Sequence, residues 1–122
     1  MQSKPFDPSD FLIVAHELAG DGSWAEARLR TAVGRAYYSV FLQARDKLQI
    51  REKKGVHTKV IQALKRVDRA AGDQLDSLES LRGAADYEMT VNDPLSRDWR
   101  SNWHRARNYA DHIARRLARL TG

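Results

Sequence analysis

Arginine and histidine are the side chains of this sequence best suited to chemistry on a phosphate ester. Histidine exchanges a proton near neutral pH, and arginine holds a phosphate and stabilises the charge that develops on it. The 122 residues contain four histidines among 21 lysines and arginines. Arg107 and His112 are separated by four residues within a helical pattern. Five residues turn an α-helix through about 500°, so these side chains point about 140° apart and would meet on one phosphate only with a second subunit.

A second group of reactive and aromatic side chains lies on a helix predicted over residues 24–49. Its apolar residues recur at three- and four-residue steps, which is typical of one buried helix face. Arg35 and Tyr38 lie off that face, three residues apart. We expect Tyr37 to be a core residue and Tyr38 to serve an interface or a groove. The apolar face comprises Leu29, Val33, Ala36, Tyr37, Val40, Phe41, Ala44 and Leu48.

A set of residues spread over positions 10–120 has the types and spacing of a known helical family. The set comprises Arg30, Arg35-Ala36-Tyr37-Tyr38, Phe41, Ala44, Leu48, His57, Leu78, Leu81-Arg82 and Ala85-Asp86-Tyr87. The chain thereby resembles the HEPN family, small all-helical domains associated with RNA and nucleotides. The resemblance implies that active members are metal-independent ribonucleases. In these members an arginine is followed by a histidine after four to six residues, and two such motifs meet across a dimer.

The matching place in this chain is the end of the helix that carries Arg82. Tyr87 stands where the histidine would fall, and a tyrosine with an ordinary pKa near 10 is a poor base at neutral pH. The resemblance therefore implies a catalytic set of Arg82, Asp86 and Tyr87, with Arg107 and His112 as the alternative set. The groove expected for RNA or a nucleotide is lined by Arg35, Tyr38, His57, Arg105 and Arg115.

The resemblance implies two candidate functions, and the basic last helix indicates a third. The first is a dimeric, RNA- or nucleotide-associated helical module without catalysis, paired with a nucleotidyltransferase-like protein in a toxin–antitoxin or defence system. The second is a metal-independent endoribonuclease that acts as a toxin. The third is a non-catalytic adaptor whose basic last helix binds nucleic acid.

The composition excludes several kinds of functional site and indicates the kind of ligand. There are no cysteines, so thiolate metal sites, disulfides and cysteine nucleophiles are excluded. No two histidines have the four-residue spacing of a zinc site, and we expect no metal and no cofactor. The longest apolar run, residues 11–15, is too short to cross a bilayer, and we expect a cytoplasmic protein. The net charge of +5 favours contact with polyanions.

The elements that must position these residues are all helices. The pattern predicts one all-α domain over residues 1–122, an up-and-down bundle of four to five helices. Helices are expected from Pro8 to about Leu18, over 24–49, over 56–70, from Asp73 to about Tyr87, and over 97–120. Breaks are expected at residues 20–22, 51–55 and 92–94, and Gly72-Asp73 is expected to stop one helix and cap the next. Ser23 to Glu26 has the spacing of a capping box.

The last predicted helix has two distinct faces. Apolar residues alternate at steps of four and three, as in a heptad seam. The seam comprises Trp99, Trp103, Ala106, Ala110, Ile113, Leu117 and Leu120. The opposite side carries Arg105, Asn108, His112, Arg115 and Arg119.

Overall fold

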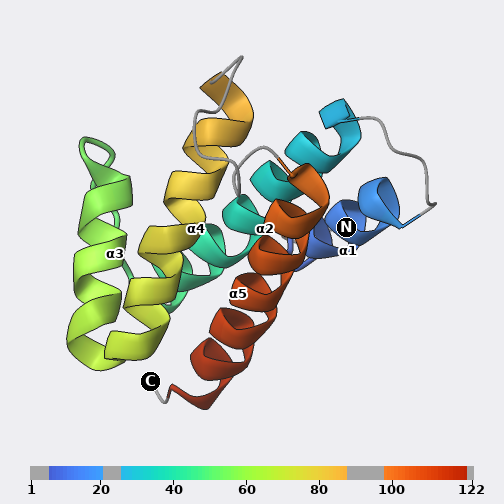
Figure 1. Cartoon of the computed structure of the whole chain (residues 1–122). Coiled ribbons are helices and arrows are strands. Elements are labelled where there is room, and N and C mark those ends of the chain that lie inside the picture. The colour runs from blue at the N-terminus through green and yellow to red at the C-terminus, as the bar shows by residue number, and fades with distance from the viewer. Residues whose placement is uncertain (1–5, 21–25, 88–97, 121–122) are drawn as a thin grey trace.

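The protein is an all-α bundle (Figure 1), seen in a computed structural model that describes residues 6–20, 26–87 and 98–120. The helices of these ranges are α1 (Asp10–Ala19), α2 (Glu26–Lys47), α3 (Val56–Val67), α4 (Arg69–Tyr87) and α5 (Trp99–Arg119). Helix α2 contacts each of the other four, and α4 lies between α3 and α5. The all-α prediction is confirmed.

Helix α2 supplies much of the core. Its residues from Leu29 to Ala44 on the predicted apolar face are buried, and Leu48 beyond the helix end is half-buried. Burying a side chain such as Val33 contributes about 1.5–3 kcal/mol. On α5, Trp99, Ile113 and Leu117 are buried, which confirms the predicted seam. Among the described helices, none combines the length and apolar character needed to cross a membrane.

The boundary between α3 and α4 differs from the prediction. The break is a single extended residue, Asp68, with φ −155° and ψ 96°. Its carboxylate accepts a hydrogen bond from the backbone N–H of Ala71 at 3.2 Å and binds Arg116 of α5 through Nε at 2.6 Å and Nη2 at 2.8 Å. Asp68 therefore caps α4 and ties it to α5, the capping role that the sequence assigned to Asp73.

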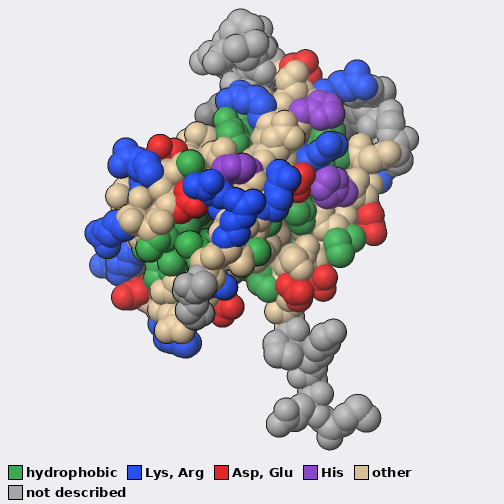
Figure 2. All heavy atoms as spheres, turned by 90° about the horizontal axis from the view of Figure 1, so that it is seen from below, with side chains coloured by type: hydrophobic (Ala, Val, Ile, Leu, Met, Phe, Trp, Pro, Cys, Tyr) green, Lys and Arg blue, Asp and Glu red, His purple; other side chains and the backbone are tan. Residues whose placement is uncertain are grey.

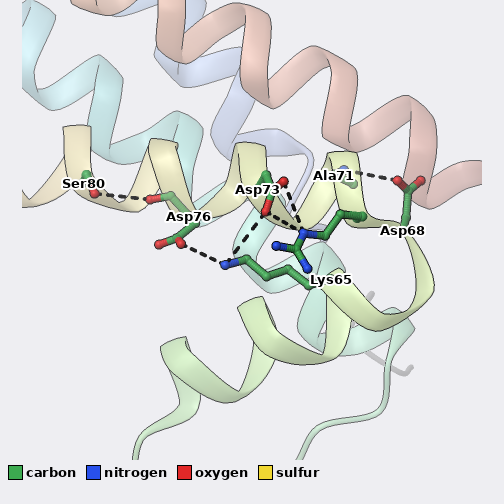
Figure 3. Close-up of polar contacts among 7 residues, drawn as sticks. Lys65, Asp68, Ala71, Asp73, Asp76 and Ser80 are labelled. Carbon is green, nitrogen blue, oxygen red and sulfur yellow. Dashed lines mark hydrogen bonds and ion pairs between the residues drawn. The ribbon is translucent and has the colours of Figure 1, made fainter.

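Gly72 lies inside α4, so the prediction that it stops a helix is wrong. A Cβ at position 72 would fall 2.6 Å from both the Cα and the N of Lys65 in α3. The role of Gly72 is therefore to let α3 and α4 approach each other closely, and not to form the turn between them. On the same side of α4, the Lys65 ammonium reaches Asp76 at 3.0 Å and Asp73 at 3.9 Å (Figure 3).

Helix ends shift by two or three residues elsewhere. Helix α1 begins at Asp10 and not at Pro8, because residues 8 and 9 form a turn in which the Asp7 carboxylate accepts from the Ser9 N–H. Helix α2 ends at Lys47, and Gln49 has a left-handed φ of 55°. Asp98 caps α5 by accepting from the N–H groups of residues 100 and 101. The Ser23 capping box and the break at 92–94 lie outside the described residues.

Candidate functional site

Arg82 is the most deeply buried charged residue described in the chain, with 8% of its surface exposed. It lies in the last turns of α4, where i−3 and i+4 neighbours share its side of the helix. Its Nη2 contacts Glu79 Oε1 at 3.0 Å, and its Nη1 contacts Asp86 Oδ2 at 3.4 Å. A guanidinium removed from water requires such partners, because an unpaired buried charge is costly.

Three tyrosine rings surround the same guanidinium. The Arg82 Cζ lies 5.3 Å from the ring centre of Tyr37, 5.7 Å from that of Tyr38 and 5.9 Å from that of Tyr87. These distances are within the range in which a cation is attracted by an aromatic ring. Tyr37 is fully buried and Tyr38 half-buried, whereas Tyr87 is 78% exposed. The arginine is therefore closed off towards α2 and borders solvent towards the end of α4.

Helix α3 adds a histidine to this group. Gly55, with a left-handed φ of 64°, precedes α3 and places His57 in its first turn. The imidazole stacks on Phe41 with ring centres 4.3 Å apart, and its Nδ1 lies 2.5 Å from the Tyr37 hydroxyl. Hereafter the Arg82 cluster means Arg82, Glu79, Asp86, Tyr37, Tyr38, Tyr87, His57 and Phe41.

Burial and charge set the protonation of the cluster. Burial, followed by the positive charge of Arg82, lowers the pKa of His57 below its ordinary value. The imidazole is therefore neutral at pH 7. Burial, reinforced by Glu79, raises the pKa of Tyr37, so its phenol stays protonated. Burial lowers the pKa of Arg82, but the electrostatic influence of Tyr38 and Glu79 outweighs it and the pKa is raised.

The cluster carries more negative than positive charge. One guanidinium faces the two carboxylates of Glu79 and Asp86, beside a neutral His57. The buried Nε–H of Arg82 has no hydrogen-bond partner among the described residues. A phosphate approaching Arg82 must therefore replace a carboxylate, and the longer, more exposed contact to Asp86 is the easier one to replace.

Five of the predicted site residues come together in this cluster: Arg82, Asp86, Tyr87, Tyr38 and His57. Three members, Glu79, Tyr37 and Phe41, were not assigned to the site from the sequence. Glu79 carries a usable signal, since it stands three residues before Arg82 on one helix. Tyr37 was predicted as core, which is confirmed, but its hydrogen bond to a histidine 20 residues away has no local signal.

Arg35 lies apart from the cluster. It is exposed, and its guanidinium carbon sits 5.3 Å from the ring centre of Phe11 in α1. Three residues along a helix separate two side chains by about 60°. That angle, together with the length of the arginine, directs Arg35 towards α1 while Tyr38 packs against α3 and α4.

The remaining predicted residues are on α5. Arg105, Arg107 and Arg115 are exposed, and α5 packs on α2 and α4 through its other face. His112 is half-buried and hydrogen-bonded through Nδ1 to the side-chain oxygen of Gln74 in α4. Within the described part of the chain, no hydrogen bond joins Arg107 to His112, as their 140° separation on one helix predicts.

The residues that the structure describes contain no group of three histidine or carboxylate side chains able to hold a metal ion. A surface hollow between residues 6–8 and the end of α2, lined in part by Leu42 and Arg45, shares no residue with the Arg82 cluster.

No protein-family model matches this chain, and neither a curated protein nor a solved structure matches it significantly.

Proposed function

We propose that the protein is a HEPN-like helical module that associates with RNA or a nucleotide as a homodimer and does not itself cleave RNA. The observation that carries this proposal is the Arg82 cluster, in which a nearly buried arginine is held at the edge of the bundle by side chains from α2 and α4. Arginine is well suited to a phosphate, and the exposed ring of Tyr87 is available to a base.

The proposed absence of catalysis is supported by the contacts that the Arg82 guanidinium already makes. Both of its terminal nitrogens contact carboxylates of the same helix. Tyr87 occupies the position at which active members of the HEPN family, which the chain resembles, carry a histidine, and a tyrosine hydroxyl is a poor proton acceptor. A guanidinium fixed in this way is suited to hold a phosphate, whereas the neighbouring Tyr87 is not suited to take a proton from RNA.

The homodimer and the partner protein belong to the same proposal. Tyrosine and arginine are enriched in protein interfaces, and Tyr38 and Tyr87 flank Arg82 at the edge of the bundle. A nucleotidyltransferase-like protein in a cytoplasmic toxin–antitoxin or defence pair is the partner that fits the resemblance. Sedimentation equilibrium tests the dimer, and a monomer at micromolar concentration would contradict it.

The binding proposal has a sharp test in Asp86→Asn. The change removes the carboxylate that competes for Arg82 without altering side-chain shape. Loss of one like charge about 4 Å from a bound phosphate is worth about 1 kcal/mol in a watery environment, so affinity for adenosine monophosphate or a short RNA rises about fivefold.

Asp76→Asn is the matched control, since Asp76 lies on the same helix and pairs with Lys65. It makes the same change in net charge away from the cluster. Equal gains in the two variants, measured by calorimetric titration, would show that Arg82 is not the phosphate site.

Ribonuclease activity is the second candidate, and His57 is the observation that favours it. A neutral imidazole in the same cluster as Arg82 is suited to accept a proton. In such a reaction the ribose 2′-oxygen attacks phosphorus, His57 Nε2 takes the 2′-hydroxyl proton, and the 5′-oxygen leaves with a proton from water. Nδ1–H would then donate to the Tyr37 hydroxyl oxygen.

Cleavage assays in EDTA separate the two candidates. The full chain is incubated with several RNAs beside His57→Gln, His112→Gln and Arg82→Lys. Loss of cleavage in His57→Gln and Arg82→Lys alone assigns the reaction to the cluster, whereas loss in His112→Gln points to Arg107 and His112. An unmutated protein that leaves every RNA intact rules out the ribonuclease.

A further inference from the structure

The outer face of α5 is basic along its length. Figure 2 shows lysine and arginine side chains gathered with histidines across the middle of the face seen from below. On α5 itself, the outer strip is defined here as Arg105, Asn108, His112, Arg115 and Arg119. All are exposed except the half-buried His112. The strip lies opposite the seam that packs on α2 and α4.

The three arginines of the outer strip are aligned by the helix. At 100° per residue, Arg105, Arg115 and Arg119 fall within an arc of about 80°. Fourteen residues separate the first from the last, and a rise of 1.5 Å per residue spaces them over about 21 Å. A straight row of guanidinium groups of this length can contact several successive phosphates of one nucleic-acid strand.

The outer strip is not neutralised by the described part of the protein. None of its three arginines forms an ion pair with a carboxylate in the described ranges. Arg115 Nε donates instead to the main-chain carbonyl of Asp111 at 3.3 Å, and that residue's carboxylate is the acid at the margin of the strip. Arg116, on the opposite margin, is engaged by Asp68.

The chemistry of the strip defines its ligand. Guanidinium and amide groups donate hydrogen bonds to phosphate oxygens. No tryptophan, tyrosine or phenylalanine belongs to the outer strip, and its one aromatic ring, the imidazole of His112, is half-buried and hydrogen-bonded to Gln74. The strip therefore offers no exposed ring on which bases stack. We propose that the outer strip of α5 binds the phosphodiester backbone of RNA or DNA without reading its sequence. This surface goes beyond the proposed function and stands on α5 alone, independently of the Arg82 cluster.

The expected salt dependence follows from the number of arginines. Three phosphate contacts to a single strand give a slope of about −2 for the logarithm of affinity against the logarithm of salt. Affinity then falls about 20-fold between 50 and 200 mM salt. A surface that does not contact phosphates lacks this slope.

Fluorescence anisotropy on the full chain tests the proposal with a labelled 20-nucleotide RNA, the DNA of the same sequence, and a second, scrambled RNA. The test variant is Arg105→Gln with Arg115→Gln and Arg119→Gln. Glutamine keeps nearly the helix propensity of arginine, and circular dichroism verifies the fold. A second variant with lysine at all three positions keeps the charge.

The control variant is Arg51→Gln with Lys53→Gln and Lys54→Gln. These three exposed cations lie between α2 and α3, and their loss changes net charge by the same amount. The glutamine variant of the outer strip loses affinity at least tenfold and its salt slope falls by about 2, whereas the control changes less than threefold and the lysine variant retains binding.

Two results would overturn the inference. One is an equal loss of affinity in the strip and control variants, which would assign binding to net charge. The other is a preference above tenfold for one RNA sequence over its scrambled form. Similar affinity for RNA and DNA identifies the shared backbone as the ligand, and a strong preference for RNA assigns it to the ribose-bearing strand. Failure of the Asp86→Asn test leaves these outcomes unchanged, because Asp86 is not part of the strip.

Discussion

Replacing Gly72 by alanine tests whether helix propensity or helix contact governs this position. In an unconstrained helix the change stabilises by about 1 kcal/mol. Here the added Cβ would lie 2.6 Å from the N and Cα of Lys65, atoms of the α3 backbone. A contact this short forces α3 away from α4, and overpacking of this kind costs about 1–3 kcal/mol or more. Because the contact is with backbone atoms, which cannot move aside as a flexible side chain can, we take a cost of about 2–3 kcal/mol and expect Gly72→Ala to be less stable than the parent by about 1–2 kcal/mol after the propensity gain.

Gly83→Ala is the matched control, in the same helix. A Cβ at position 83 meets no atom within 4 Å, so the full propensity gain of about 0.5–1 kcal/mol is expected. For a chain of this length, 1 kcal/mol corresponds to about 4 °C in Tm. Thermal and urea unfolding followed by circular dichroism should move in opposite directions for the two variants. A Gly72→Ala protein as stable as Gly83→Ala would refute the close approach of α3 and α4.

Three further predictions concern the residues around the α3–α4 boundary and the cluster. Asp68→Ala loses both the α4 cap and the Arg116 contact, so urea unfolding should show a free energy of unfolding lower by about 2–3 kcal/mol. Asp68→Asn can still cap α4, so it should retain the contribution of the cap, about 1 kcal/mol of that total. Because the Arg116 hydrogen bond holds the pKa of Asp68 below its ordinary value, this contribution is present above pH 4 and disappears as pH falls through the lower folded pKa. Because burial and Arg82 lower the pKa of His57, the unfolded chain binds that proton first, so stability falls as pH drops below about 6.5 and levels off below the folded pKa. Thermal unfolding in a pH series should lose this step in His57→Gln, and an unchanged profile would contradict the assignment. Tyr37→Phe removes the hydroxyl that His57 contacts and should lower the free energy of unfolding by about 1 kcal/mol in the same assay. An unchanged free energy would show that the hydrogen bond does not stabilise the fold.

Much of the fold could be predicted because helices record their buried face in local spacing. The seams of α2 and α5 depend on steps of three and four residues, and the structure buries these positions. Gly72 was misread because a glycine that ends a helix and one that admits a neighbouring backbone look alike in sequence. Asp68, the residue that does separate the helices, depends on Arg116, 48 positions away.

The sequence predicted most of the residues of the candidate site, but not how they contact one another. Spacing along α4 places Asp86 with Arg82, since four residues return to the same side of a helix. That His57 would stack on Phe41 and contact Tyr37 depends on the crossing of α2 and α3, which no local pattern specifies. The same applies to Arg35, whose direction was set by the position of Phe11 in α1.

Because the break at Asp68 is a single residue, a small tilt of α3 about this point moves the far end of the helix. His57 stands at the other end of this helix, 11 residues from Asp68, a distance of about 16 Å along the axis. A tilt of only 5° about the break would displace the imidazole by about 1.4 Å, enough to break its contact with Tyr37. The Arg116–Asp68 ion pair at the break and the contacts of Lys65 with α4 together hold α3 against such a tilt. The position of His57 in the Arg82 cluster thus depends on contacts made at the far end of its own helix.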